Sequence, residues 1–348
     1  MKSGIIGLPQ SGKTSLFKIL TKGHGAVGKS PREAGIGIAS VPDERLDKLA
    51  ALYHPKKLTY ATIEYVDSGP ITPESLKDPT FISALRNVDC LVHVVKAFDE
   101  EIKPLDEIKH LEFELLVSDL EQIEKRLNKL EKDAKKMKGL EKEFELLKKS
   151  KTHLEQEKPL RSMDLSLEEK KALRGFAFLS EKPVLIVLNV SEKEVSNLES
   201  AIPKYGLEKL NEMTNQEITA VCGKIEAELA EMKEEEAAEF LTGFGLKESG
   251  LIRLIRKTYQ LMGLISFFTA GEDECKAWTI PQDSKAVEAA RAIHSDLAAH
   301  FIRAETIRWN ELLEAGSESA AKARGILRLE GKEYIVQDGD VLHIRHSG

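Results

Sequence analysis

The sequence predicts an α/β fold, a doubly wound and mostly parallel sheet with an inserted helical arm and a small C-terminal α+β domain. Three features of the 348-residue chain indicate this fold. A glycine-rich loop near the N-terminus joins an apolar segment to a helix, short apolar runs alternate with helical periodicity, and a stretch rich in Glu and Lys interrupts them. The chain is too long for one ordinary core, so we expect two or three domains.

Six short apolar runs are expected to form the parallel sheet. Two of them, 90–95 and 183–188, are almost continuously apolar, as in strands buried on both faces. The expected strands are residues 3–6, 36–41, 62–66, 90–95, 183–188 and 218–221. Helical segments lie between these runs, which favours a sheet covered by helices on both sides.

Residues 112–151 have a different composition, dominated by Glu and Lys. Their apolar residues recur at alternating spacings of four and three, the heptad pattern of a coiled coil. These residues are Leu116, Leu120, Ile123, Leu127 and Leu130. The apolar pattern resumes at Leu140, after a turn at Lys138 and Gly139, so we expect two long antiparallel helices. The arm is either a solvated hairpin with a structural role or a partner-binding element.

The C-terminal region combines apolar strands with a helix around 286–299, which predicts a small α+β domain. Residues 334–336 and 341–344, with Asp338 and Gly339 at the turn, are expected to form a closing hairpin. The region carries 10 Lys or Arg and 14 Asp or Glu residues after position 265, so its net charge does not indicate an RNA-binding face.

Composition excludes several other classes of protein. No apolar run approaches the ~20 residues that span a membrane, and the N-terminal apolar run leads straight into the loop instead of forming a secretory signal. We therefore expect a cytoplasmic protein. Three distant cysteines, Cys90, Cys222 and Cys275, predict neither disulfides nor a zinc site. The net charge of −7 gives no general attraction to nucleic acid, so DNA is not an expected partner.

The segment Gly7-Leu8-Pro9-Gln10-Ser11-Gly12-Lys13-Thr14 has the form G-x-x-x-x-G-K-[ST] of a phosphate-binding loop. Backbone N–H groups of such a loop surround phosphate oxygens, and the following helix directs its positive end to the same place. Lys13 would reach the β- and γ-phosphates, and the Thr14 hydroxyl would bind Mg²⁺. The alternative is a glycine-containing turn with only a structural role. The context favours a P-loop nucleotide-binding domain.

Asp67 ends an expected strand, where P-loop proteins place a carboxylate that helps to hold Mg²⁺. Lys13 and Asp67 are therefore the candidate catalytic residues, and Thr14 and Asp67 are the candidate metal ligands. The sequence Asp67-Ser68-Gly69-Pro70 resembles the D-x-x-G element of GTPases, but Pro70 has no N–H to donate to a γ-phosphate. An ordinary turn after the strand is the alternative.

Asn189-Val190-Ser191-Glu192 follows a buried strand, where GTPases carry N-K-x-D. The aspartate of that motif accepts hydrogen bonds from guanine. Glu192 has one more methylene, which displaces the carboxylate and favours adenine.

Taken together, the chain resembles the YchF family of Obg-like ATPases, in the translation-factor class of P-loop GTPases. The resemblance covers nearly the whole chain. The segments that carry it are 7–14, 41–46, 119–127, 189–192, 224–229, 267–271, 277–280 and 336–341. It implies a C-terminal TGS domain with a β-grasp fold, binding of ATP or GTP with Mg²⁺, slow hydrolysis and association with ribosomes or ribosomal RNA.

The resemblance also assigns site residues and domain boundaries. It implies that the loop residues hold the phosphates, that Asn189 and Val190 contact the base, and that Glu192 lies near it. The phosphate-holding residues are Pro9, Gln10, Ser11, Gly12, Lys13, Thr14 and Ser15. The expected boundaries are 1–100 and 181–264 for the nucleotide-binding domain, 101–180 for the coiled-coil insertion and 265–348 for the TGS-like domain.

This chain departs from the family pattern in both switch regions. Pro31 stands where the family has a threonine that completes the Mg²⁺ shell, and Pro70 replaces a switch glycine. Two functions remain open: a slow, ribosome-linked NTPase switch, or a nucleotide-bound binding module that does not hydrolyse. A small-molecule kinase is disfavoured, because no acceptor site or arginine-rich lid accompanies the loop.

Overall fold

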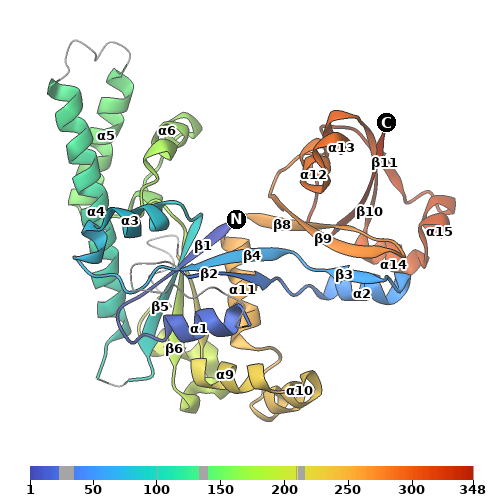
Figure 1. The fold of residues 1–348 in the computed structure, drawn as a ribbon, viewed down its shortest axis with the longest axis horizontal. Helices are drawn as coiled ribbons and strands as arrows, with labels where there is room; N and C mark the ends of the chain where they lie inside the picture. The colour runs from blue at the N-terminus through green and yellow to red at the C-terminus, as the bar shows by residue number, and fades with distance from the viewer. Residues whose placement is uncertain (23–34, 100, 133–139, 209, 211–215, 348) are drawn as a thin grey trace. The chain divides into compact units, whose positions relative to one another are not determined.

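The computed structural model describes residues 1–22, 35–99, 101–132, 140–208, 210 and 216–347. They form two compact units (Figure 1). The first unit comprises Met1–Ala39 and Glu64–Thr258, and the second comprises Ser40–Ile63 and Tyr259–Gly348. Residues 40–63 thus group with the C-terminal part of the chain, whereas the sequence-based boundaries assign them to the nucleotide-binding domain.

The first unit is built on a six-stranded sheet in the order β2-β4-β1-β5-β6-β7. Its strands are β1 (Lys2–Ile6), β2 (Gly35–Ser40), β4 (Thr62–Asp67), β5 (Cys90–Ala97), β6 (Val184–Val190) and β7 (Glu217–Val221). The neighbours β4, β1, β5, β6 and β7 pair in parallel. The predicted parallel α/β sheet is therefore confirmed.

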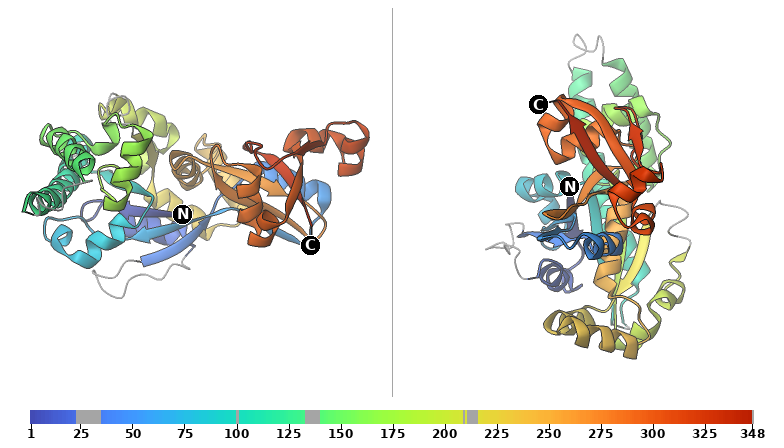
Figure 2. Two further views of the ribbon diagram at one scale, coloured as in Figure 1. Left: turned by 90° about the horizontal axis from the view of Figure 1, so that it is seen from above. Right: turned by 90° about the vertical axis from the view of Figure 1, so that its right-hand side faces the viewer.

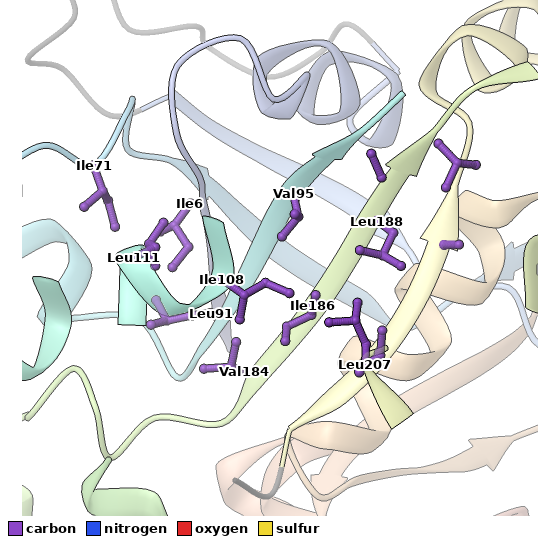
Figure 3. Packing of buried hydrophobic residues seen from close by; sticks show 14 of the residues in the cluster. Ile6, Ile71, Leu91, Val95, Ile108, Leu111, Val184, Ile186, Leu188 and Leu207 are labelled. Atoms are coloured by element: carbon purple, nitrogen blue, oxygen red, sulfur yellow. The ribbon is translucent and has the colours of Figure 1, made fainter. Parts of the chain in front are cut away.

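Helices follow the strands of this sheet along the chain. They are α1 (Lys13–Leu20), η1 (Ser75–Lys77), α3 (Pro79–Arg86), α4 (Pro104–Lys132), α5 (Glu141–Glu155), η3 (Leu160–Ser162), α6 (Leu167–Leu173), η4 (Arg174–Phe176), η5 (Glu192–Ser200), α7 (Ala201–Lys204), α9 (Gly223–Glu231), α10 (Glu234–Gly243) and α11 (Gly250–Leu261). Figure 3 shows Ile108 and Leu111 of α4 beside Leu91, Val95 and Ile186 of the central strands. Burial of these apolar side chains against the sheet is the main stabilising contribution to such a core.

The two arm helices, α4 and α5, lie side by side in Figures 1 and 2. The heptad residues of α4 pack in one cluster with apolar residues of α5, which confirms the predicted helical arm. This cluster includes Leu116, Ile123, Leu127, Leu130, Leu146, Leu147 and Leu154. The expected turn at Lys138 and Gly139 lies outside the described residues.

Asp119 of α4 binds the segment that leads into β6 and so connects the arm helix to the sheet. Its carboxylate is fully buried and accepts hydrogen bonds from the backbone N–H groups of Leu179 at 3.0 Å and Ser180 at 2.7 Å. The Arg86 guanidinium, at the end of α3, donates to it at 3.2 Å. These bonds hold the segment that leads into β6, because they satisfy backbone groups that burial would otherwise leave without water.

The second unit contains a six-stranded sheet in the order β11-β10-β12-β8-β9-β3. Its strands are β3 (Lys57–Thr59), β8 (Leu264–Thr269), β9 (Glu274–Pro281), β10 (Phe301–Arg308), β11 (Arg328–Glu330) and β12 (Asp340–His346), and its helices are α2 (Glu44–Tyr53), α12 (Ala286–Ile293), α13 (Ser295–Ala299), α14 (Trp309–Ala315) and α15 (Glu318–Ala323). Ala286, Ala289 and Ala290 of α12 pack against Phe267 and Leu342 of this sheet. The α+β class of this region agrees with the prediction.

The predicted closing hairpin is wrong. Strand β12 pairs with β10 and β8, whereas Ile335 forms only an isolated bridge with Lys285. The cause is the turn before β12: the Gly339 N–H donates to the Ser266 carbonyl oxygen at 2.8 Å, and the Asp338 carboxylate accepts from the Ser266 N–H at 3.0 Å. These contacts attach the turn to β8 rather than to residues 334–336.

Segment 40–63 belongs to the second unit through specific polar contacts. The Arg45 guanidinium donates to the carboxylates of Asp43 and Asp338, each at 2.7 Å, and lies 5.3 Å from the centre of the Phe268 ring. Strand β3 pairs in parallel with β9. Among the described residues, no helix has the length and apolar character needed to cross a membrane.

Replacing Asp119 by asparagine should destabilise the first unit strongly. The asparagine side chain would keep the shape, but the Arg86 charge would lose its partner, and the amide cannot accept from both backbone N–H groups. Removing one partner of a buried ion pair costs about 3–5 kcal/mol. Urea denaturation should show this loss, whereas Glu121→Gln, at an exposed pair on the same helix, should change stability by less than about 0.5 kcal/mol. Equal stability of both variants would contradict the role of Asp119.

Candidate nucleotide-binding site

The phosphate-binding loop lies between the end of β1 at Ile6 and the start of α1 at Lys13. Its two motif glycines are required by close contacts. A Cβ on Gly7 would lie 2.5 Å from the Val94 carbonyl oxygen, and a Cβ on Gly12 would lie 2.3 Å from Asn189 Nδ2. Gly12 also has a φ of 93°, which a side chain would strain. Any side chain at Gly7 or Gly12 would therefore clash with β5 or β6, so only glycine lets the loop pass this close to them.

Asn189, at the end of β6, links this loop to the start of α9. Its Nδ2 donates to the Ser11 carbonyl oxygen at 3.0 Å, and its Oδ1 accepts from the Gly223 N–H at 3.0 Å. The residue is only 6% exposed. The amide therefore holds the two loops together, a role distinct from the base contact that the resemblance implies.

The loop side chains divide into buried and exposed groups. Lys13 and Ser11 are buried, whereas Pro9, Gln10, Thr14 and Ser15 are exposed. Lys13 Nζ lies 3.4 Å from the Leu8 carbonyl oxygen, and Ser11 Oγ has no hydrogen-bond partner among the described residues. Burial lowers the pKa of Lys13, while the carboxylates of Asp67 and Glu107 act in the opposite direction. The ammonium group therefore lies in a partly desolvated place that an anion would stabilise.

Asp67 ends β4 beside the start of the loop, because the β1–β4 register places it opposite Ile5. It is 8% exposed. Its Oδ1 accepts from the Gly69 N–H at 3.3 Å, and the Ile71 N–H donates to the Gly7 carbonyl oxygen at 3.3 Å. Since Pro70 has no N–H, positions 69–71 offer no uncommitted backbone donor in this arrangement.

Val190 and Glu192, the other two residues expected at or near the base, occupy different environments. Val190 is 2% exposed and packs in the hydrophobic core, so its contact with a base stays a prediction. Glu192 is exposed, and its Oε2 accepts from Lys224 Nζ at 2.9 Å. Pro31, the replaced switch residue, lies outside the described residues.

Glu107 is a further residue of the site that sequence reasoning missed. It lies in the first turn of α4, is 6% exposed, and its Oε2 accepts from the Lys96 N–H at 3.2 Å. Its Oε1 has no partner within the part of the chain that the structure describes. Burial raises its pKa to about 7, although the Lys96 N–H and the charges of Lys96 and Lys13 oppose the shift. In the sequence it is one glutamate among many, and no spacing marks it.

No group of three or more His, Cys, Asp and Glu side chains suited to a metal occurs in the described ranges. A carboxylate and a hydroxyl, as offered by Asp67 and Thr14, are nonetheless the hard oxygen donors that Mg²⁺ prefers, and Mg²⁺ usually keeps several waters. The residues present therefore fit a magnesium ion held partly by phosphate oxygens.

Comparison with known proteins identifies the family. The ribosome-binding ATPase YchF of Bacillus subtilis (strain 168) is 41% identical over 363 residues, covering 100% of this chain and 99% of that protein. The chain belongs to the YchF family. The ribosome-binding ATPase YchF of Escherichia coli O157:H7 is 36% identical and covers 98% of both chains. The family resemblance seen in the sequence is thus confirmed.

Two further comparisons extend the YchF assignment. The structure of the Schizosaccharomyces pombe YchF GTPase matches with a TM-score of 0.85 at 30% identity, covering 99% of this chain and 97% of that one. The family model YchF-GTPase_C, described as a protein of unknown function (DUF933), matches residues 264–347. The YchF fold therefore covers nearly the whole chain, and the family model covers its C-terminal part.

Replacing Glu107 by glutamine should change how stability depends on pH. The folded pKa of about 7 exceeds the ordinary 4.5, so the unfolded chain loses this proton first. The contribution of Glu107 to the free energy of unfolding is fully present below pH 4.5 and is lost as the pH rises through 7. Glutamine cannot titrate, so the variant should gain stability relative to the parent over this range, by at most about 1.4 kcal/mol per pH unit.

Urea denaturation between pH 5 and pH 8 would measure this difference. Glu101→Gln, at an exposed neighbouring glutamate, should run parallel to the parent. If the free energy of unfolding of Glu107→Gln also changed with pH in parallel with the parent, the raised pKa of Glu107 would be contradicted.

Proposed function

We propose that this chain binds a purine nucleoside triphosphate at the loop of residues 7–14 and hydrolyses it slowly as an ATPase. The observation that carries the proposal is the fixed loop: Gly12 packs against Asn189, whose amide ties Ser11 to Gly223. A loop already held in place binds phosphate without a further ordering cost. The YchF relatives named ATPases support hydrolysis as the activity.

The proposal assigns the phosphate contacts to the loop and the metal contacts to Thr14 and Asp67. The N–H groups of residues 10–15 would bind phosphate oxygens, and Lys13 would lie against the β- and γ-phosphates. A bound Mg²⁺ would neutralise phosphate charge, with Thr14 and Asp67 among its ligands. Burial of Lys13 strengthens its interaction with the polyanion, because charges attract more strongly where water is excluded.

Slow turnover follows from the second switch. Ile71 stands where many GTPases carry a glutamine that orients the attacking water. It is buried and apolar, so it cannot do this. The N–H groups of Gly69 and Ile71 donate to Asp67 and Gly7. Stabilisation of the charge that develops on the γ-phosphate would then rest mainly on Lys13 and the metal.

The same contacts favour a second candidate, a binding module that holds nucleotide without hydrolysis. If no backbone donor senses the third phosphate, ADP and a non-hydrolysable ATP analogue would bind with similar affinity. A tenfold or greater preference for the analogue, about 1.4 kcal/mol, would exclude this candidate.

We propose further that the chain acts at the ribosome, which would place it in the cytoplasm. The support is its 41% identity, over the full chain, to a protein named a ribosome-binding ATPase. The bound nucleotide would bias this association, since a ligand shifts a conformational equilibrium only by its differential affinity for the two states.

Replacing Lys13 by alanine should abolish phosphate release in single-turnover hydrolysis and weaken ATP binding at least tenfold, because the buried ammonium is lost. Lys18→Ala, an exposed lysine later in α1, is the matched control and should behave like the parent. Phosphate release by the parent at the rate of the Lys13→Ala variant would refute hydrolysis while leaving binding open.

Co-sedimentation should test the ribosomal role on the full chain. We expect more protein to pellet with ribosomes in the presence of the non-hydrolysable ATP analogue than with ADP, and Lys13→Ala to show no such dependence. A truncation after Gly263 is unsuitable, because it would remove the sheet that carries α2 and β3. Absence of pelleting in every nucleotide state would count against the ribosomal role.

A further inference from the structure

Glu107, in the first turn of the arm helix α4, binds β5 beside the point where β1 becomes the phosphate-binding loop. Strand β1 pairs with β5 up to its last residue. Gly7 then lies against the Val94 carbonyl oxygen, and two residues farther along β5 the Lys96 N–H donates to Glu107 Oε2 at 3.2 Å. Two residues of a strand span about 7 Å, so the carboxylate lies close to the loop.

The charged groups around Glu107 come from three strands and helices. Burial raises the pKa of Glu107, while the charges of Lys96 on β5 and Lys13 on α1 lower it. Burial lowers the pKa of Lys13, and the carboxylates of Asp67 on β4 and Glu107 oppose this shift. The Lys96 ammonium is already paired with Asp99, with Nζ 2.7 Å from Oδ2. Glu107 and Lys13 thus stabilise each other's charged forms in a place with little water.

The second carboxylate oxygen of Glu107 is not committed. The residue is 6% exposed, and its Oε1 has no hydrogen-bond partner in the ranges that the structure describes. An ionised carboxylate is costly in such a place unless cations offset its charge, and a proton on Oε1 removes that cost. The state of Glu107 therefore depends on what happens to Lys13.

Binding of a nucleoside triphosphate would change this balance of charge. The Lys13 ammonium would pair with phosphate oxygens, and Mg²⁺ would attract Asp67. Glu107 would face additional negative charge and gain no cation in exchange. Repulsion between like charges is strong where water is excluded, and a carboxylate under such repulsion binds a proton.

We propose that Glu107 is a positioning residue of the nucleotide site: its carboxylate is a counter-charge that holds the Lys13 ammonium, and a nucleotide that pairs with Lys13 binds together with one proton at Glu107. The proton comes from solvent and is carried on Oε1. This inference rests on the proposed nucleotide function. It gives the arm helix a part in nucleotide binding that does not require the N–H groups after Asp67.

Calorimetric titration of the full chain with Mg²⁺ and the imido analogue of ATP, at pH 6 and pH 8, would test it. Glu107→Gln keeps an oxygen for the Lys96 N–H but carries no charge. At pH 6 the parent carboxyl is mostly protonated before binding, so both proteins should bind within about twofold of each other. At pH 8 the variant should bind about tenfold more tightly, because only the parent must take up a proton.

The protons taken up can be counted at pH 7.5 by repeating the titration in two buffers with different ionisation enthalpies. The parent should take up at least about half a proton more than Glu107→Gln. A merely structural role of Glu107 would not produce this difference. Asp106→Asn is the matched control, since it removes an exposed carboxylate from the same turn of α4, and it should behave like the parent.

Tighter binding at pH 8 together with lost proton uptake, in Glu107→Gln alone, would support the inference. Equal proton uptake by the parent and Glu107→Gln, or the same changes in Asp106→Asn, would overturn it while the proposed function stands. Failure of the parent to bind the analogue at millimolar concentration at either pH would overturn both.

Discussion

The carboxamide of Asn189 is the contact on which the candidate site depends. It bonds in two directions, to the Ser11 carbonyl oxygen and the Gly223 N–H, and it is almost entirely buried. Two glycines make room for it, because a Cβ on Gly12 or Gly223 would lie 2.3 Å or 3.2 Å from its polar atoms. One side chain thus sets the distance between the phosphate-binding loop and the start of α9. A nucleotide that binds here would therefore meet two loops that are already held in place.

The opposite end of the site is arranged differently. There the backbone donors after Asp67 bond within the protein, and Ile71 is packed in the core. If a nucleotide binds as proposed, the fixed loop would hold its first phosphates, while few groups are positioned for the third. An enzyme gains rate only from contacts that strengthen in the transition state. Nucleotide binding with slow turnover would be the physical consequence of this division.

The sheet, the helical arm and the phosphate loop were predictable because each has a local pattern: apolar runs, heptads and a glycine spacing. Glu107 was not, since only burial distinguishes it from neighbouring glutamates. The Arg45–Asp338 contact joins residues 293 positions apart, so no window of sequence contains both. For the same reason the closing hairpin was misassigned: bonds from Ser266 to residues 338 and 339 outweigh a local turn signal.

The placement of segment 40–63 changes how the C-terminal unit should be understood. The family model begins at residue 264, yet β3 extends the C-terminal sheet and Arg45 neutralises Asp338. A fragment starting at 264 would leave that carboxylate and the edge of β9 without these partners. Segment 40–63 returns through β4, a continuous strand that passes Ile63 and ends at Asp67. The chain therefore passes directly from β3, which pairs with β9, into the strand that ends at Asp67.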